Sequence, residues 1–100
     1  MKVILNSRGI CAYADYDIST NKCVVLAGSE VTPTVSQAPT FRSKNTVVKL
    51  REKYVKDCIV TEDVHFKSPS TAANFITGSS TNGFAAWKTE DGRTIRDLHR

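Results

Sequence analysis

Hydrophobic and polar residues alternate near the start of the chain, which is the pattern of a β-strand with one buried face. The clearest alternation covers residues 10–17. Its apolar positions on one face are Ile10, Ala12, Ala14 and Tyr16. Turn residues separate this segment from a β-branched run at 23–27, so the two predict an antiparallel hairpin. The short apolar run at 3–5 predicts an edge strand.

Two later segments have the spacing of amphipathic helices, with apolar residues three and four positions apart. The first begins at a cap, Asn45 or Thr46, and runs to about Asp57. Its apolar positions are Val47, Val48, Leu50, Tyr54, Val55 and Cys58. The second follows Ser68, whose side chain can cap a helix, and ends at Gly78, which can take the left-handed conformation.

The remaining predicted elements are short. Residues 59–60, 64–66 and 84–88 predict strands, and Asp91-Gly92 predicts a tight turn. Residues 96–100 predict a final helical turn. The whole pattern predicts an α+β fold, in which an antiparallel sheet has two or three short helices packed on one side.

The length of 100 residues predicts a single small domain over residues 1–100. A Pro/Ser/Thr-rich segment at about 30–44 is expected to be an exposed, mobile loop. No apolar run approaches the roughly 20 residues that a membrane span needs, and the first residues are too short for a secretory signal. We therefore expect a cytoplasmic protein without membrane contact.

Candidate reaction chemistry is sparse. The three cysteines, Cys11, Cys23 and Cys58, form no Cys-x-x-Cys pair, and the two histidines are far apart in the sequence. We therefore expect reduced thiols and no metal site. The sequence has neither a Gly-x-Ser-x-Gly elbow nor a phosphate-binding Gly-Lys-Ser/Thr loop. From this we expect no catalytic residues, no cofactor and no enzymatic activity.

A polar loop next to aromatic residues is the strongest candidate for binding. The loop consists of Ser79, Ser80, Thr81 and Asn82, and it precedes Phe84 and Trp87. Hydroxyl and amide groups beside an aromatic ring can hold a base or a phosphate. In the alternative, both aromatic residues belong to the core and Asn82-Gly83 is only a turn. The net charge of +4 permits nucleic-acid binding but does not require it.

The same stretch carries a family resemblance. Residues 67–88 contain Ser-Pro-Ser-Thr-Ala-Ala, Gly-Ser-Ser-Thr-Asn-Gly and Trp-Lys, and Asp-Gly-Arg-Thr-Ile follows at 91–95. This pattern resembles a bacterial domain of unknown function that is often found C-terminal to GIY-YIG nuclease domains. It is also similar to the RAMA (restriction enzyme and adenine methyltransferase associated) domain, whose signature matches Ser80, Asn82, Gly83 and Trp87. These families often have Trp directly after Asn-Gly, where this chain has Phe84.

The resemblance implies a non-catalytic accessory module that binds nucleic acid, with DNA as the expected partner and the chemistry supplied by another protein. The loop of residues 79–82 and an aromatic ring would then contact the strand. The expected phosphate contacts are Lys49, Arg51, Lys53, Lys67, Lys88 and Arg93. The alternative is a regulatory domain that binds a protein partner and no nucleic acid, through a sheet edge or the apolar face of the helix at 46–57.

Overall fold

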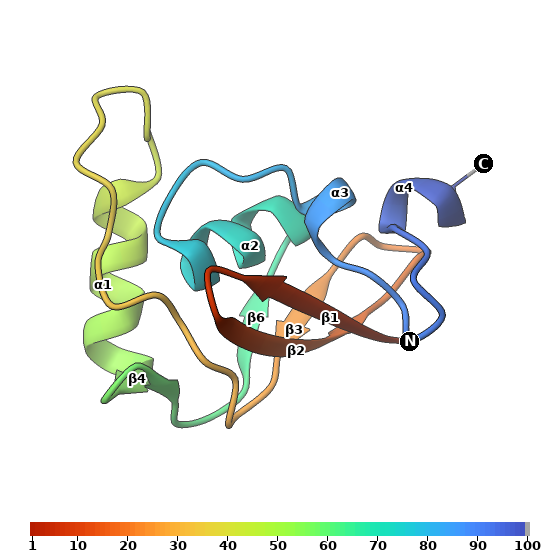
Figure 1. Cartoon of the computed structure of the whole chain (residues 1–100), viewed down its shortest axis with the longest axis horizontal. Helices are drawn as coiled ribbons and strands as arrows, with labels where there is room; N and C mark the ends of the chain where they lie inside the picture. The colour runs from red at the N-terminus through yellow and green to blue at the C-terminus, as the bar shows by residue number, and fades with distance from the viewer. Residues whose placement is uncertain (100) are drawn as a thin grey trace.

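The computed structural model describes residues 1–99 and confirms the α+β fold (Figure 1). A four-stranded antiparallel sheet has the strand order β1-β2-β3-β6. Its strands are β1 (Lys2–Ser7), β2 (Ile10–Tyr16), β3 (Cys23–Val25) and β6 (Val64–Phe66). The helices are α1 (Lys44–Tyr54), α2 (Pro69–Thr77), α3 (Gly83–Ala86) and α4 (Ile95–Leu98). Figure 1 places α1 at one end of the molecule and α4 at the other, with α2 and α3 between them.

The alternation predicted for residues 10–17 matches the inner face of the sheet. Strands β1 and β2 pair so that Val3 lies opposite Ala14 and Leu5 opposite Ala12. All four of these side chains are buried. The sheet therefore buries one face, as period-two spacing requires, and α2 packs against its strands β3 and β6.

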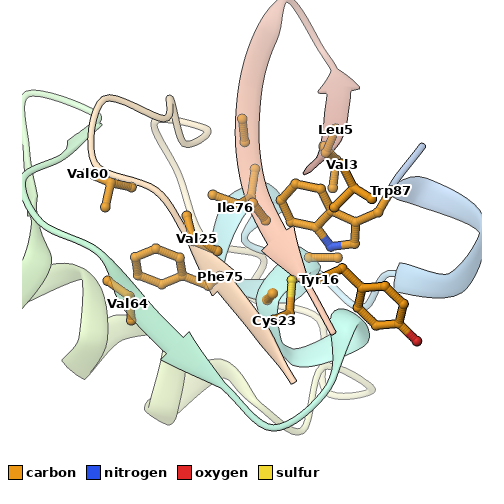
Figure 2. Packing of buried hydrophobic residues seen from close by; sticks show 14 of the residues in the cluster. Val3, Leu5, Tyr16, Cys23, Val25, Val60, Val64, Phe75, Ile76 and Trp87 are labelled. Atoms are coloured by element: carbon orange, nitrogen blue, oxygen red, sulfur yellow. The ribbon is translucent and has the colours of Figure 1, made fainter. Parts of the chain in front are cut away.

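Trp87 lies in the middle of the core. Its side chain is 0% exposed and lies beside Val3, Leu5 and Ile76 (Figure 2). The indole N–H donates a hydrogen bond of 3.0 Å to the carbonyl oxygen of Pro69, so its polar group is satisfied without a ligand. Of the two alternatives for Trp87, the structure supports packing, and direct stacking of this ring on a nucleic acid is excluded.

Helix α2 begins and ends where the sequence predicts. The Ser68 hydroxyl accepts the backbone N–H of Thr71 at 3.2 Å. At the other end Gly78 adopts the left-handed conformation, with φ of 68°. The turn at 91–92 and the final helix α4 are also present, although Arg100 lies outside the described residues.

The strand predicted at 84–88 is wrong for most of its length. Residues Gly83–Ala86 form the helical turn α3, because the Asn82 side chain caps it by accepting the N–H of Phe84 at 3.1 Å. The two alanines, Ala85 and Ala86, also favour a helix over a strand. Only Lys88 pairs in β fashion, with Ile4 of the edge strand β1.

The first predicted helix ends three residues early. Helix α1 stops at Tyr54, and a small hairpin of β4 (Val55–Lys56) and β5 (Ile59–Val60) follows. Asp57 and Cys58 have φ values of 53° and 63°, as a tight hairpin turn of type I′ requires. Val55 and Cys58 also fit the helical spacing, and for this reason the sequence pattern predicts a helix that continues past Tyr54 to about Asp57.

The segment at 30–44 is irregular up to the start of α1, as predicted, but it is not exposed throughout. Val31 and Thr32 are buried next to the core, and Phe41 is buried near α1. The segment is therefore anchored near both ends, and in its middle the N–H of Ser36 donates to the Gly78 carbonyl oxygen at 2.6 Å. Within residues 1–99, no helix is both long and apolar enough to cross a membrane.

Candidate nucleic-acid interface

Helix α3 is fixed tightly on the N-terminus of α2. The N–H of Gly83 donates to the hydroxyl of Ser70 at 3.0 Å. A Cβ atom at position 83 would lie 2.1 Å from the Pro69 carbonyl oxygen, so no other residue fits without movement. This contact places Asn82 and Phe84 at the surface and lets the chain return to the core at Trp87.

A shallow hollow lies between α3 and α4, and we call it the α3–α4 hollow. Its volume is about 360 Å³. Its lining residues are Asn21, Asn82, Phe84, Arg96 and His99. The rings of Phe84 and His99 meet edge to face, with 6.2 Å between their centroids. The hollow thus joins an aromatic surface, two amides and a cation from three distant parts of the sequence.

The amide oxygens of the hollow are already used inside the protein. The Asn82 oxygen accepts the N–H of Phe84, and the Asn21 oxygen accepts the Tyr16 hydroxyl. Both amide NH₂ groups therefore stay available as donors. Figure 2 shows the Tyr16 hydroxyl pointing away from the buried cluster. Burial raises the pKa of this phenol, so the hydroxyl stays neutral at physiological pH.

The same network fixes the tautomer of His99. Its Nε2 atom lies 2.7 Å from the Tyr16 oxygen. Because Tyr16 gives its one hydrogen to Asn21, its oxygen accepts from the N–H of His99 Nε2, and a neutral His99 ring then keeps Nδ1 as an acceptor. With Arg96 exposed on α4 and no carboxylate among the lining residues, the hollow offers donors and positive charge. Such a surface suits a ligand that is rich in acceptors or negatively charged.

On the other side of α3 lies a second, larger hollow along the edge of the sheet, which we call the β1-edge groove. Its volume is about 430 Å³. Strand β1 forms one wall, and the opposite wall is formed by Thr77, Thr81, Ala85 and Ala86. Lys88 and the turn after it close one end. Helix α3 therefore separates two hollows that differ in chemistry.

Comparison with known proteins adds the family. The family model described as a domain of unknown function (DUF4357) matches residues 4–99. The chain belongs to this family. The match confirms the predicted membership in a family of domains of unknown function. No curated protein and no solved structure matches the chain.

In this DUF4357 domain the predicted polar loop is divided between the two hollows. Asn82 lines the α3–α4 hollow and Thr81 lines the β1-edge groove, whereas Ser80 is exposed. The Ser79 N–H donates to the Thr77 hydroxyl at 3.3 Å, so this residue stabilises the loop itself. The backbone of Thr81 is likewise held by the Asn74 side chain at 2.8 Å.

The predicted phosphate contacts do not form one patch. Lys88 lines the β1-edge groove, and the Arg93 guanidinium pairs with Asp91 at 3.0 Å in the adjacent turn. Lys67 lines a separate hollow beside α1. Lys49 and Lys53 lie on α1, which Figure 1 places at the end of the molecule opposite α4. Only Lys88 among them lies beside α3.

Arg51 holds three segments of the protein together and is not free for phosphate. Its Nε atom donates to the Phe75 carbonyl at 3.0 Å, and its Nη2 atom donates to the Ile76 carbonyl at 3.1 Å. Its Nη1 atom donates to the Thr32 carbonyl at 2.7 Å. The guanidinium thus satisfies carbonyl groups at the C-terminal end of α2, where a cation is favourable. The expectation that Arg51 contacts phosphate is corrected.

Sequence reasoning missed three residues of the α3–α4 hollow: Asn21, Arg96 and His99. Asn21 precedes Asn82 by 61 residues, whereas Arg96 and His99 follow it by 14 and 17, and no local motif connects them. Asn21 has a φ of 63°, a conformation that asparagine tolerates, and this fixes its side chain near Tyr16. Its place in a predicted turn was visible in the sequence, but its neighbours were not.

Proposed function

We propose that this DUF4357 domain is a non-catalytic accessory module that binds DNA, in a restriction–modification or nuclease context. The observation that supports it is the set of donors that line the α3–α4 hollow beside the Phe84 ring, namely the amide NH₂ groups of Asn21 and Asn82 and the Arg96 guanidinium. Phosphates and base carbonyls are acceptors, and an aromatic ring gives an unpaired base a surface to stack on. The resemblance to domains found with GIY-YIG nucleases, and to RAMA domains, agrees with a role in which a partner supplies the chemistry.

Each residue of the hollow has a distinct part in this proposal. Arg96 contacts a phosphate, and the half-buried Phe84 ring stacks on a base at a strand end, a mismatch or a single strand. The amide NH₂ of Asn82 donates to a base oxygen. Lys88, on the other side of α3, contacts a second phosphate. Phe84 occupies the place where related families often have Trp, and its smaller ring still presents a π-face.

Two phosphate contacts predict a shallow salt dependence. With Arg96 and Lys88 as the cations, the logarithm of the binding constant should fall against the logarithm of salt concentration with a slope of roughly −1.4 to −1.8. A sequence-blind basic surface that used all the exposed lysines would give a much steeper slope. The slope therefore separates a defined contact from general electrostatic attraction.

The test is fluorescence anisotropy with labelled DNA, as duplexes and single strands with and without N6-methyladenine, across a salt series. Arg96→Gln is compared with Arg42→Gln, since both remove one positive charge and Arg42 is exposed before α1. We expect Arg96→Gln to weaken binding about tenfold while Arg42→Gln changes it less than twofold. Equal losses in the two variants, with no binding near physiological salt, would refute the proposal.

The alternative function is binding of a protein partner. The apolar face of α1 does not support it, because Val47 is buried and Leu50 and Tyr54 pack against the core. The observation that does favour it is on β2, where the Tyr13 side chain is 36% exposed with the Lys2 ammonium 5.2 Å from its ring centroid. If the DNA test fails, this surface is the place to look for a partner.

A further inference from the structure

The backbone of Asn6 has an open donor and an open acceptor. On β2, the N–H of Tyr13 bonds Ser29 and the N–H of Cys11 bonds Glu30, so both residues point their backbone groups away from β1. Ile4 and Asn6 lie opposite these two residues, and their backbone groups must therefore point out of the sheet edge. Ile4 uses both groups with Lys88, at 2.7 and 2.9 Å.

Asn6 is the next outward-facing position and has no partner for these groups within residues 1–99. If residues 86–88 continued as a strand, Ala86 would lie opposite Asn6. The chain instead turns into α3, which ends at Ala86. That departure opens the β1-edge groove, and Asn6, Ala85 and Ala86 all line it.

The size of this opening decides between possible occupants. An added peptide strand needs several open backbone pairs along an edge. Here Ile4 is already paired, and β1 ends at Ser7, so Asn6 supplies one donor–acceptor pair only. One adjacent N–H and C=O match the edge of a single planar ring that has its own neighbouring donor and acceptor, as a nucleobase does.

The other walls agree with such a ring. The groove of about 430 Å³ is within the range of small-molecule sites. The methyl groups of Ala85 and Ala86 give it an apolar side, and the Thr81 hydroxyl is fixed 2.7 Å from that of Thr77. The exposed Lys88 stands at one end, where the phosphate of a nucleotide would project.

We propose that the β1-edge groove binds a single nucleobase, whose edge pairs with the backbone N–H and C=O of Asn6. This deepens the proposed DNA binding and rests on it for the source of the base, which would be unstacked from the strand. A free nucleotide presents the same chemistry, so the experiment distinguishes the two sources.

The first arm records amide NMR spectra during titration with adenosine monophosphate and thymidine monophosphate, with deoxyribose 5-phosphate as the control without a base. The second arm uses DNA that contains 2-aminopurine, which brightens when it is unstacked. Asn6→Pro removes the backbone donor, and an outward edge N–H is a position where proline is tolerated. Asn6→Ala keeps that donor and removes only the side chain. Ala85→Leu fills the groove, and Ala38→Leu is the matched control at another exposed alanine.

We expect the Asn6 amide to shift with at least one nucleotide and not with the sugar phosphate. Asn6→Pro and Ala85→Leu should weaken nucleotide binding about fivefold to tenfold, and the two control variants less than twofold. Emission of the buried Trp87 checks that each variant is folded.

If DNA binds but neither the Asn6 amide nor 2-aminopurine responds, the base site is refuted and the proposed function stands. If nucleotides shift the Asn6 amide but DNA does not bind, the groove is a site for free nucleotides and the proposed DNA binding fails. If neither nucleotide nor DNA produces a response, both proposals fail.

Discussion

Replacing Arg51 tests whether one side chain holds α1, α2 and the segment at residue 32 together. Arg51→Met keeps most of the length of the side chain and removes the guanidinium. Four hydrogen bonds are lost, to the carbonyl groups of Phe75, Thr32 and Ile76 and to the Thr32 hydroxyl. The Phe75 carbonyl at the end of α2 then loses the hydrogen bond from Arg51, whereas the Ile76 carbonyl keeps the one that it accepts from the N–H of Thr32 at 2.9 Å.

The expected loss of stability follows from the net contribution of these hydrogen bonds, after the cost of removing the groups from water is subtracted. Hydrogen bonds to a charged group stabilise a protein by roughly 1.5–3 kcal/mol each. Burial lowers the pKa of Arg51, which shows that desolvation of the cation offsets part of this gain. Counting about half of the bonds as net gain, we expect the free energy of unfolding to fall by about 3 kcal/mol. For a domain of this size the melting temperature should then fall by about 12 °C or more.

Urea unfolding followed by Trp87 emission measures this change, because Trp87 is the single tryptophan and is wholly buried. Lys49→Met, at an exposed position of the same helix, is the control and should stay within about 0.5 kcal/mol of the unchanged protein. Arg51→Lys should be intermediate, since an ammonium cannot reach all four acceptors. If Arg51→Met and Lys49→Met are equally stable, the bracing role of Arg51 is wrong.

Three further predictions follow from particular contacts. Gly83→Ala should destabilise the domain by at least about 3 kcal/mol in thermal unfolding, because the new Cβ atom would overlap the backbone of α2. Gly92→Ala is the control: its Cβ atom would meet open space, so the cost is only that of the φ of 86°, about 1 kcal/mol. Burial raises the pKa of the Cys23 thiol to about 12, so maleimide labelling at pH 7 should modify the other two cysteines first and reach Cys23 only on unfolding. Asn82→Asp keeps the cap of α3 and should leave the melting temperature within about 2 °C. The same change replaces a donor by a carboxylate and should abolish DNA binding in the anisotropy assay.

The sequence was sufficient to predict an element when the residues that determine its ends lie within the element or next to it. Helix α2 has a capping serine, a proline at its first position and a glycine in the left-handed conformation, and all three act within the element. The face of β2 was equally predictable, because period-two spacing requires only that one side of the sheet be buried. In both cases the interactions that decide the structure lie a few residues apart.

The errors arose where a distant contact decided the outcome. Helix α3 forms where a strand was predicted at 84–88, because Gly83 fits against Pro69 and the Asn82 side chain caps the start of the helix. Arg51 was predicted to contact phosphate, yet its side chain reaches the end of a helix 24 residues later in the sequence. Neither contact can be predicted from the residues within a few positions of Gly83 or Arg51.

The same distinction applies to the candidate site. The polar loop and Phe84 were visible in the sequence, whereas the partners that give them a chemical character were not. The Asn82 amide is a donor toward the hollow only because its oxygen is held by α3, and Asn21 is a donor only because Tyr16 occupies its oxygen. Composition alone would describe the loop as both donor and acceptor. The fold therefore leaves the two amide NH₂ groups and Arg96 facing the hollow, and these donors are what the proposed contact with an acceptor-rich strand would use.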